Sequence, residues 1–249
     1  QGGLAPGDLS SWVFAAFGFG GLLTMSYSYL FRQPIAIMWT IPGAVLVGGA
    51  LPHLTFAEVI GAYLVCGVLL AFLGVTGLVR KIMAAIPMPI VMAMVAGVFL
   101  PFGLNIIKAF DEATVMAIVM VAAFAIPTAL PRLGRVLPPV LCALAAGTAA
   151  IIFSGQMTGV EIPSLAIAEP ILYTPVFTLR ALGELVVPLA VTVIAAQNAQ
   201  GFVILRQAGF EPPENSLTVT CGLGSLVFGI FGSVPTCVTG PANAIPNTP

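Results

Sequence analysis

The sequence predicts an all-α polytopic membrane protein with two broken half-helix segments, and three observations lead to this prediction. Hydrophobic residues make up 59% of the 249 positions and charged residues only 7%, whereas roughly a quarter of the residues in a soluble domain are charged. The mean hydropathy of +1.10 extends along the whole chain, which excludes a secreted domain and a single-anchor protein. The 27 glycines and 21 prolines indicate broken helices, because membrane spans tolerate them where neighbouring helices satisfy the backbone.

The apolar segments predict the number of spans. A span needs about 20 mainly apolar residues, and by this criterion residues 1–249 form a single membrane domain with about nine of them. We expect spans at 12–31, 33–51, 56–79, 87–107, 112–130, 137–154, 185–206, 215–231 and, incomplete, 233–249. The connections are short except for 155–184, which we expect to be an external loop.

The basic residues predict the orientation, because cytoplasmic loops have an excess of Lys and Arg. Only Lys108 and Arg180 fall on one side of the expected spans. The others fall on the opposite side, and they are Arg32, Arg80, Lys81, Arg132, Arg135 and Arg206. Residue 1 and the 155–184 loop are then external. We expect an internal piece of a longer transporter, since the chain starts outside without an initiator Met and stops within an apolar run.

Two segments are poor continuous helices. Residues 33–41 are rich in β-branched and aromatic side chains, and the residue before Pro42 is pushed out of the α region. A short extended piece followed by a half-helix fits better, with Pro42 in the first turn, where proline is tolerated. Residues 232–245 have the same order of parts, so that Thr40-Ile-Pro-Gly-Ala can be laid over Thr239-Gly-Pro-Ala.

Paired broken segments of this kind indicate a midplane substrate site in secondary transporters. Each half-helix N-terminus has about half a positive charge and several unpaired N–H groups. Two of them facing each other attract an anion without a buried Lys or Arg, and no basic residue lies in the middle of any expected span. The alternative is that both segments are ordinary proline kinks.

Three amides lie within four positions of an otherwise apolar span, at Gln197, Asn198 and Gln200. Polar side chains in such a span need partners. Regular helix geometry places Gln197 and Gln200 on one face and turns Asn198 about 100° away from Gln197. They belong either to the substrate site or to hydrogen bonds between helices.

Other classes of function find little support. An intramembrane enzyme needs a nucleophile, a metal set or paired carboxylates, and His53 is the single histidine, in an expected loop. No basic cluster suits nucleic acid. We therefore expect no enzyme activity, cofactor, metal or nucleic-acid partner. The cysteines stand in apolar stretches and are expected to be small buried side chains: Cys66, Cys142, Cys221 and Cys237.

Four stretches are distinctive as sequence, at 33–44 (Gln-Pro-Ile-Ala-Ile-Met-Trp-Thr-Ile-Pro-Gly-Ala), 74–78, 194–213 and 220–225. In them, and over essentially the whole chain, the sequence resembles the benzoate/proton symporter family, the benzoate membrane transport proteins. The resemblance implies the architecture of uracil/xanthine and sulfate permeases, a seven-plus-seven inverted-repeat transporter with core and gate domains. The chain then looks like helices two to ten, with the breaks in the third and tenth and the amides on the eighth.

The resemblance also implies a function. We expect secondary active transport of a small organic anion, benzoate or a similar aromatic monocarboxylate, by proton symport with alternating access. A sulfate-like inorganic-anion permease and a passive anion channel are the alternatives. Proton coupling rests on the resemblance alone, because the span at 185–206 has no carboxylate after Glu184.

The expected substrate-binding residues come from the two half-helices and the amide cluster, with Trp39 placed to stack on a ring. They are Trp39, Pro42, Gly43, Ala44, Gln197, Asn198, Gly240, Ala242 and Asn243. The expected partners are a small aromatic carboxylate, a proton and the lipid of a bacterial inner (plasma) membrane, which the chain crosses several times. A homodimer is left open.

Overall fold

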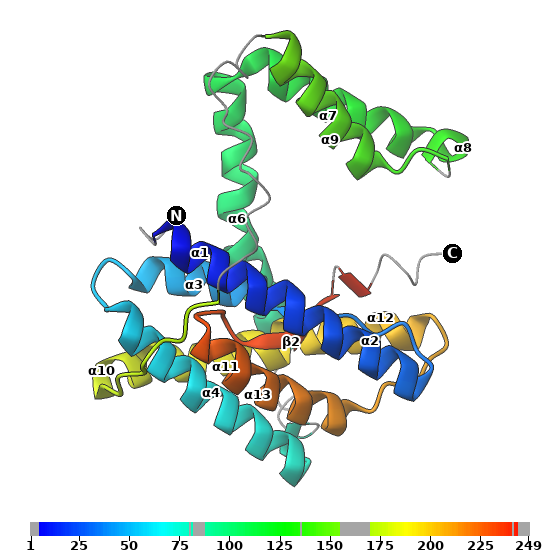
Figure 1. The fold of residues 1–249 in the computed structure, drawn as a ribbon. Coiled ribbons are helices and arrows are strands. Elements are labelled where there is room, and N and C mark those ends of the chain that lie inside the picture. The colour runs from blue at the N-terminus through cyan, green and yellow to red at the C-terminus, as the bar shows by residue number, and fades with distance from the viewer. Residues whose placement is uncertain are drawn as a thin grey trace. The chain divides into compact units, whose positions relative to one another are not determined.

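The computed structural model describes residues 5–79, 81, 88–134, 136–154, 170–240 and 242–243. The chain divides into two compact units, each described here by itself. The first consists of Gln1–Val98 and Ile167–Pro249, and the second of Phe99–Ala166. Figure 1 shows the elements of both.

One continuous helix opens the first unit. It consists of α1 (Pro6–Val13), the π-helical turn η1 (Phe14–Phe19) and α2 (Gly20–Phe31). The expected span began at 12, but Pro6 stands in the first turn and Asp8 accepts a hydrogen bond from the Ala5 amide at 3.1 Å, so the helix starts earlier. It ends at Arg32, whose φ of 51° is left-handed.

A strand and a half-helix follow, as the proline-containing segment predicted. Strand β1 (Ile37–Trp39) leads into α3 (Ile41–Ala50), with Thr40 as the N-cap. The next helix, α4 (Phe56–Thr76), begins with a capping box between Thr55 and Glu58 and ends at Gly77, with φ 68°.

The amide cluster lies in a long helix with two π-helical turns. Its parts are α10 (Leu179–Ala181), η2 (Leu182–Val186), α11 (Val187–Val191), η3 (Thr192–Asn198) and α12 (Ala199–Gln207). We expected an external loop as far as 184. The helix instead begins at Leu179, because the Thr178 hydroxyl accepts a hydrogen bond from the Ala181 amide at 3.3 Å and caps it.

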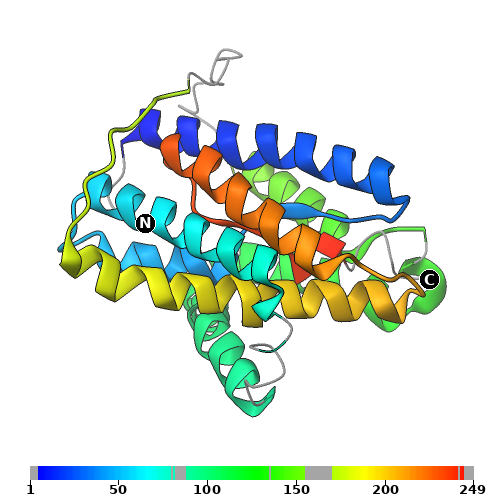
Figure 2. The ribbon, with the colours of Figure 1, turned by 90° about the horizontal axis from the view of Figure 1, so that it is seen from below.

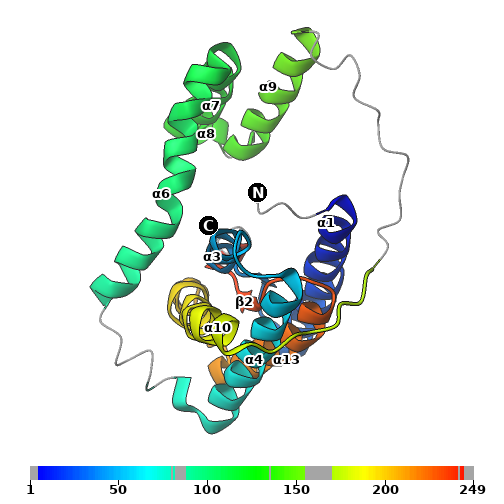
Figure 3. The ribbon, with the colours of Figure 1, turned by 90° about the vertical axis from the view of Figure 1, so that its left-hand side faces the viewer.

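Helix α13 (Glu214–Ile230) precedes the second strand, β2 (Thr236–Val238). The two strands pair antiparallel, with Ile37 opposite Val238 and Trp39 opposite Thr236. Figure 3 shows β2 in the middle of the unit, between α3 and α13. The all-α prediction therefore needs one addition, a sheet of two short strands. Of the expected last span, 233–249, positions 241 and 244–249 lie outside the described residues.

Glycines bring α4 and α13 into close contact, and Figure 2 shows the two helices side by side. A Cβ atom on Gly222 would lie 2.3 Å from the Ala71 nitrogen, and one on Gly67 would lie 2.9 Å from the Gly222 oxygen. The helix backbones therefore approach closely, as small residues permit in membrane proteins. Buried apolar residues of α3, α4, the long α10–α12 helix and β2 form the main core of this unit.

The second unit contains most of α6 (Met88–Glu112) together with α7 (Thr114–Ala129), α8 (Pro131–Gly134) and α9 (Pro139–Phe153). Helices α7 and α9 pack side by side, and the Met120 side chain fills the space above Gly147. Apolar side chains on their outer faces are open, such as Val115 at 74% and Phe153 at 90% exposure. Such faces suit a hydrocarbon surrounding.

Three continuous helices within the described residues are long and apolar enough to cross a bilayer: Gly7–Phe31, Phe56–Thr76 and Leu179–Gln207. Shorter apolar helices are Ile41–Ala50, Thr114–Ala129 and Pro139–Phe153. The predicted fold class, a polytopic helical membrane protein, is confirmed. The inverted repeat stays a prediction.

Candidate functional site

The two strands bring the start of α3 close to the residues that follow β2. The Thr40 amide donates to the Pro235 oxygen at 3.0 Å, and the Thr239 amide donates to the Ala36 oxygen at 3.3 Å. Because the strands are antiparallel, the chain leaves the sheet in opposite directions after β1 and after β2. The positive dipole end of α3 points back toward the sheet.

The first turn of α3 is capped from within. The Thr40 hydroxyl accepts a hydrogen bond from the Gly43 amide at 3.3 Å, and the Ala44 amide donates to the Thr40 oxygen at 3.0 Å. Pro42 has no N–H group to donate. The Ile41 amide is therefore the one donor of this turn that has no acceptor among the described residues. A Cβ on Gly43 would lie 2.3 Å from the Thr40 methyl carbon, so only glycine fits there.

Asn243 holds the residues that follow β2. Its side-chain nitrogen donates to the oxygens of Ala36 at 2.9 Å and Thr239 at 2.8 Å, and its side-chain oxygen accepts from the Ala36 amide at 2.9 Å. These contacts tie the chain before β1 to the helical residues after β2. Asn243, expected to bind substrate, is placed here as a clamp.

Gln197 and Asn198 both face β2 and the residues after it. The Gln197 side-chain oxygen accepts from the Gly240 amide at 3.3 Å, and the Asn198 side-chain oxygen accepts from the Val238 amide at 2.8 Å. Their side chains are 1% and 0% exposed. Regular α-helix geometry placed them about 100° apart. They lie instead in η3, and its π-helical bonds change the angular spacing.

Asn198 has one unsatisfied group. Its oxygen must face the Val238 amide, so its nitrogen faces the other way, and that nitrogen is buried with no hydrogen-bond partner among the described residues. The cost of such an orphaned donor is about 1–3 kcal/mol. A ligand oxygen would satisfy it.

The helix with the amides lies directly against the second strand. A Cβ on Gly201 would lie 2.6 Å from the Val238 oxygen, and one on Gly240 would lie 2.7 Å from the Gln200 side-chain oxygen. All nine predicted site residues are uncharged, so any attraction for an anion at the strands would come from backbone dipoles and polar groups. Among the buried residues that the structure describes, Glu214 is the charged one, and it pairs with Arg206.

Trp39 does not stand alone. Its ring meets the Trp12 ring of α1 edge to face, with centroids 4.9 Å apart and planes at 70°. An arrangement of this type is favourable for aromatic pairs. A bound ring would therefore compete with Trp12 for the edge or the face of Trp39.

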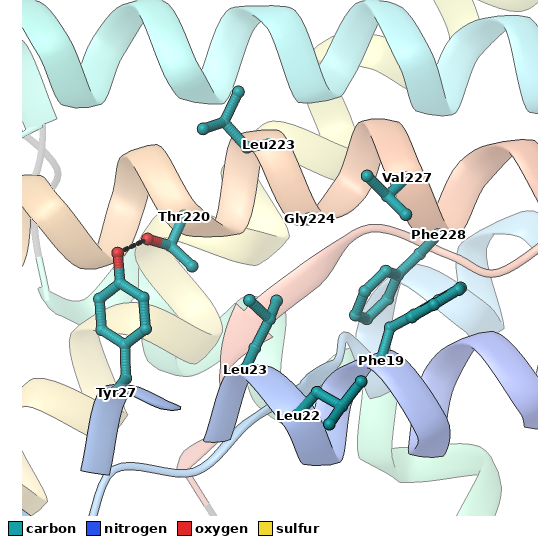
Figure 4. A pocket seen from close by; sticks show the side chains of 9 residues that line it. All are labelled: Phe19, Leu22, Leu23, Tyr27, Thr220, Leu223, Gly224, Val227 and Phe228. Carbon is teal, nitrogen blue, oxygen red and sulfur yellow. Dashed lines mark hydrogen bonds between the residues drawn. The ribbon is translucent and has the colours of Figure 1, made fainter. Parts of the chain in front are cut away.

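A cavity of about 430 Å³ lies elsewhere in this unit, between α2 and α13, and includes none of the predicted site residues. Figure 4 shows its apolar side chains and, at one end, the hydrogen bond between the Tyr27 and Thr220 hydroxyls. With nine lining residues and no charge among them, it has no group that would select an anion.

Comparison with known families decides the assignment. Residues 1–247 match the family described as "Benzoate membrane transport protein". The chain belongs to the benzoate membrane transport protein family. The resemblance noted in the sequence is thereby confirmed.

Two relatives support the location of this chain in the bacterial inner membrane. The chain crosses that membrane several times. The inner membrane protein YdcO of Escherichia coli (strain K12) is 30% identical over 234 residues, covering 92% of this chain and 58% of the relative. A benzoate membrane transport protein of Acinetobacter baylyi (strain ATCC 33305 / BD413 / ADP1) is 26% identical over 227 residues, covering 90% and 56%. The chain thus spans under two thirds of either relative.

In this family member, the structure brings together most of the predicted site residues around the two strands. Sequence reasoning missed Thr40 as the cap, Ala36 as the partner of Asn243 and Trp12 as the partner of Trp39. The first could have been found, because a threonine directly before Ile-Pro-Gly is an N-cap signal. The others depend on contacts between distant parts of the chain.

Proposed function

We propose that the full-length protein is a secondary active transporter of a small organic anion, benzoate or a similar aromatic monocarboxylate, and not an enzyme. The observations on which this proposal rests are the pairing of β1 with β2 next to the start of α3, and the buried amide nitrogen of Asn198, which has no hydrogen-bond partner among the described residues. Proton symport enters the proposal from the family resemblance. The bilayer is the surrounding medium, and a homodimer is its proposed assembly.

The binding step follows from the dipoles. A carboxylate beside the strands would interact favourably with the positive ends of both helical segments, by about 1–2 kcal/mol each where the site is partly buried. Its oxygens would accept hydrogen bonds from the Ile41 amide and the Asn198 side-chain nitrogen, and the 3.3 Å bond from the Gly43 amide to Thr40 is long enough to be exchanged for a ligand bond. A neutral ligand would gain little from this field.

The uncharged site also suits release. A buried Lys or Arg would hold a carboxylate strongly, whereas partial charges at helix ends supply a smaller attraction that a carrier can break during each cycle. Alternating access requires two bodies that move relative to each other, and the two compact units of the chain are the candidates for them. The unit with both half-helices would then bind the anion, and the unit with α7 and α9 would be its counterpart.

The test is uptake of radiolabelled benzoate into proteoliposomes with the full-length protein, with and without an inward proton gradient. We expect saturable accumulation driven by the gradient. Saturable uptake of sulfate, without competition by benzoate, would replace the substrate class. Flux that neither saturates nor exchanges would instead show a channel.

A matched pair of variants tests the site. Asn198→Leu removes both the orphaned donor and the acceptor of the Val238 amide. Benzoate uptake should fall by about tenfold or more, because the loss of one charge-assisted hydrogen bond to the anion corresponds to at least that factor. Asn105→Leu makes the same change on an exposed face of α6 and should leave uptake unchanged. Equal uptake in both variants would remove Asn198 from the site.

A further inference from the structure

A smaller cavity, of about 150 Å³, runs along α3 in the first unit. One face of α3 lines it through Ala44, Val47, Gly48 and Leu51, which recur at helical spacing from the first turn to the end of the helix. The cavity therefore extends from near the capped start of the half-helix to the turn at 51–54, on the side of the membrane that the basic residues predict to be external.

Three of the six residues that line the cavity opposite α3 are aromatic, and the others are Leu9, Gly232 and Val234. Trp12 comes from α1, and Phe56 and Tyr63 come from α4; Figure 3 labels the three helices. Neither a charged residue nor an amide side chain lines the cavity. A carboxylate would lose its hydration there and find only the Trp12 indole and Tyr63 hydroxyl groups as donors, with no positive charge, whereas an apolar ring loses little.

The size matches one ring. An apolar cavity of about 150 Å³ in another protein takes up benzene. Aromatic walls add edge-to-face contacts, which favour a flat ring over an aliphatic chain of equal volume.

The cavity also adjoins the region where the strands meet. Ala44 belongs both to the lining and to the first half-helix, and Trp12 joins the lining to Trp39 through their edge-to-face contact at 4.9 Å. A ring in the cavity would therefore contact Trp12, and Trp12 in turn contacts Trp39.

We propose that this cavity is a binding site for one uncharged aromatic ring, separate from the anion site beside the strands. Its ligands are single-ring aromatic compounds with or without a carboxylate, and a carboxylate would point out of the mouth toward water. Occupancy fixes Trp12 against Trp39 and α3, so a ring compound that is not transported would change benzoate uptake without competing for the anion site.

Phenol is the probe, because it supplies a ring without a carboxylate, and acetate is the converse control. The readout is tryptophan fluorescence of the purified full-length protein, compared with a Trp12→Phe variant so that the Trp12 contribution is obtained by difference. We expect a saturable response to phenol that is absent in Trp12→Phe, and none to acetate.

Two neighbouring glycines provide the decisive comparison. A Cβ on Gly48 or on Gly49 meets nothing within 4 Å, so both positions accept a side chain, but only Gly48 lines the cavity. Gly48→Leu fills much of the space and should weaken phenol binding by about tenfold or more. Gly49→Leu should leave it unchanged.

A graded series guards against misfolding. Gly48→Ala, Gly48→Val and Gly48→Leu should lower phenol affinity in the order of added volume, with circular dichroism and gel filtration reporting on the fold. A non-saturable response, or equal affinity across the series, overturns the proposal. Asn198→Leu should lose benzoate uptake and keep the phenol response, so failure of the anion site and failure of the cavity give different results.

Discussion

At the scale of single residues, the uncharged polar side chains around the two strands are used mainly as braces. Asn243 makes two side-chain hydrogen bonds to Ala36 and one to Thr239, and the Ser225 hydroxyl accepts one from the Thr236 amide at 2.9 Å. Each side chain satisfies backbone groups that the short strands leave unpaired, which is required in hydrocarbon. Two buried side-chain atoms have no partner among the described residues, the Gln33 oxygen and the Asn198 nitrogen, and of these only the nitrogen can donate a hydrogen bond to an anion.

The cap on α3 leads to a prediction about Thr40. Thr40→Val keeps the shape and removes the hydroxyl that accepts from the Gly43 amide, so stability should fall by about 1 kcal/mol, the usual loss for an N-cap. Thermal unfolding in detergent measures this, and Thr40→Ser, which retains the hydroxyl, should stay close to the parent. Unchanged unfolding temperatures in both variants would show that the cap contributes nothing.

At the scale of elements, the contact between α4 and α13 depends on backbone approach. Gly222→Ala would place a methyl carbon 2.3 Å from the Ala71 nitrogen, and a helix backbone cannot move aside as a side chain can. We expect destabilisation of about 1–3 kcal/mol from overpacking.

The control for this change is Gly21→Ala in α2, where an added Cβ meets nothing within 4 Å. It should be neutral or stabilising by up to about 1 kcal/mol. Unfolding temperatures of the two variants, measured side by side, provide the comparison. If Gly222→Ala unfolds like Gly21→Ala, α4 and α13 do not pack as closely as described.

At this scale, the sequence could predict the local backbone structure of single segments. Pro42, Gly43 and the β-branched residues before them predict a strand followed by a half-helix, because each acts on its own stretch of backbone. The pairing of Met38 with Cys237 could not be predicted, since three-residue strands contain no register information. The π-helical turn that contains Asn198 was not predicted for a different reason: such a turn depends on tertiary packing, and periodicity arguments assume a regular helix.

At the scale of the whole molecule, the predicted orientation places the ends of the long α10–α12 helix on opposite sides of the membrane. Glu184 would be external, paired with His53 at 2.7 Å, and Arg206 would be internal. Single cysteines at the exposed positions 183 and 207, in a full-length variant without other cysteines, should react with a membrane-impermeant maleimide from opposite faces. Labelling of position 207 from outside in intact cells would reverse the orientation.

The sheet that joins β1 to β2 also has a consequence for biosynthesis. Cys237 leaves the ribosome roughly 200 residues after its partner Met38, about 10–40 s later at ordinary translation rates. During that interval the peptide groups that bond to the later segment, such as the Ala36 carbonyl and the Thr40 N–H, have no partner there, and hydrocarbon does not tolerate such groups. The segment between α2 and α3 must therefore remain in a hydrated or protein-lined environment, such as the insertion machinery, until β2 is synthesised. Membrane insertion of the first half-helix would then be completed only after synthesis of the tenth predicted helix.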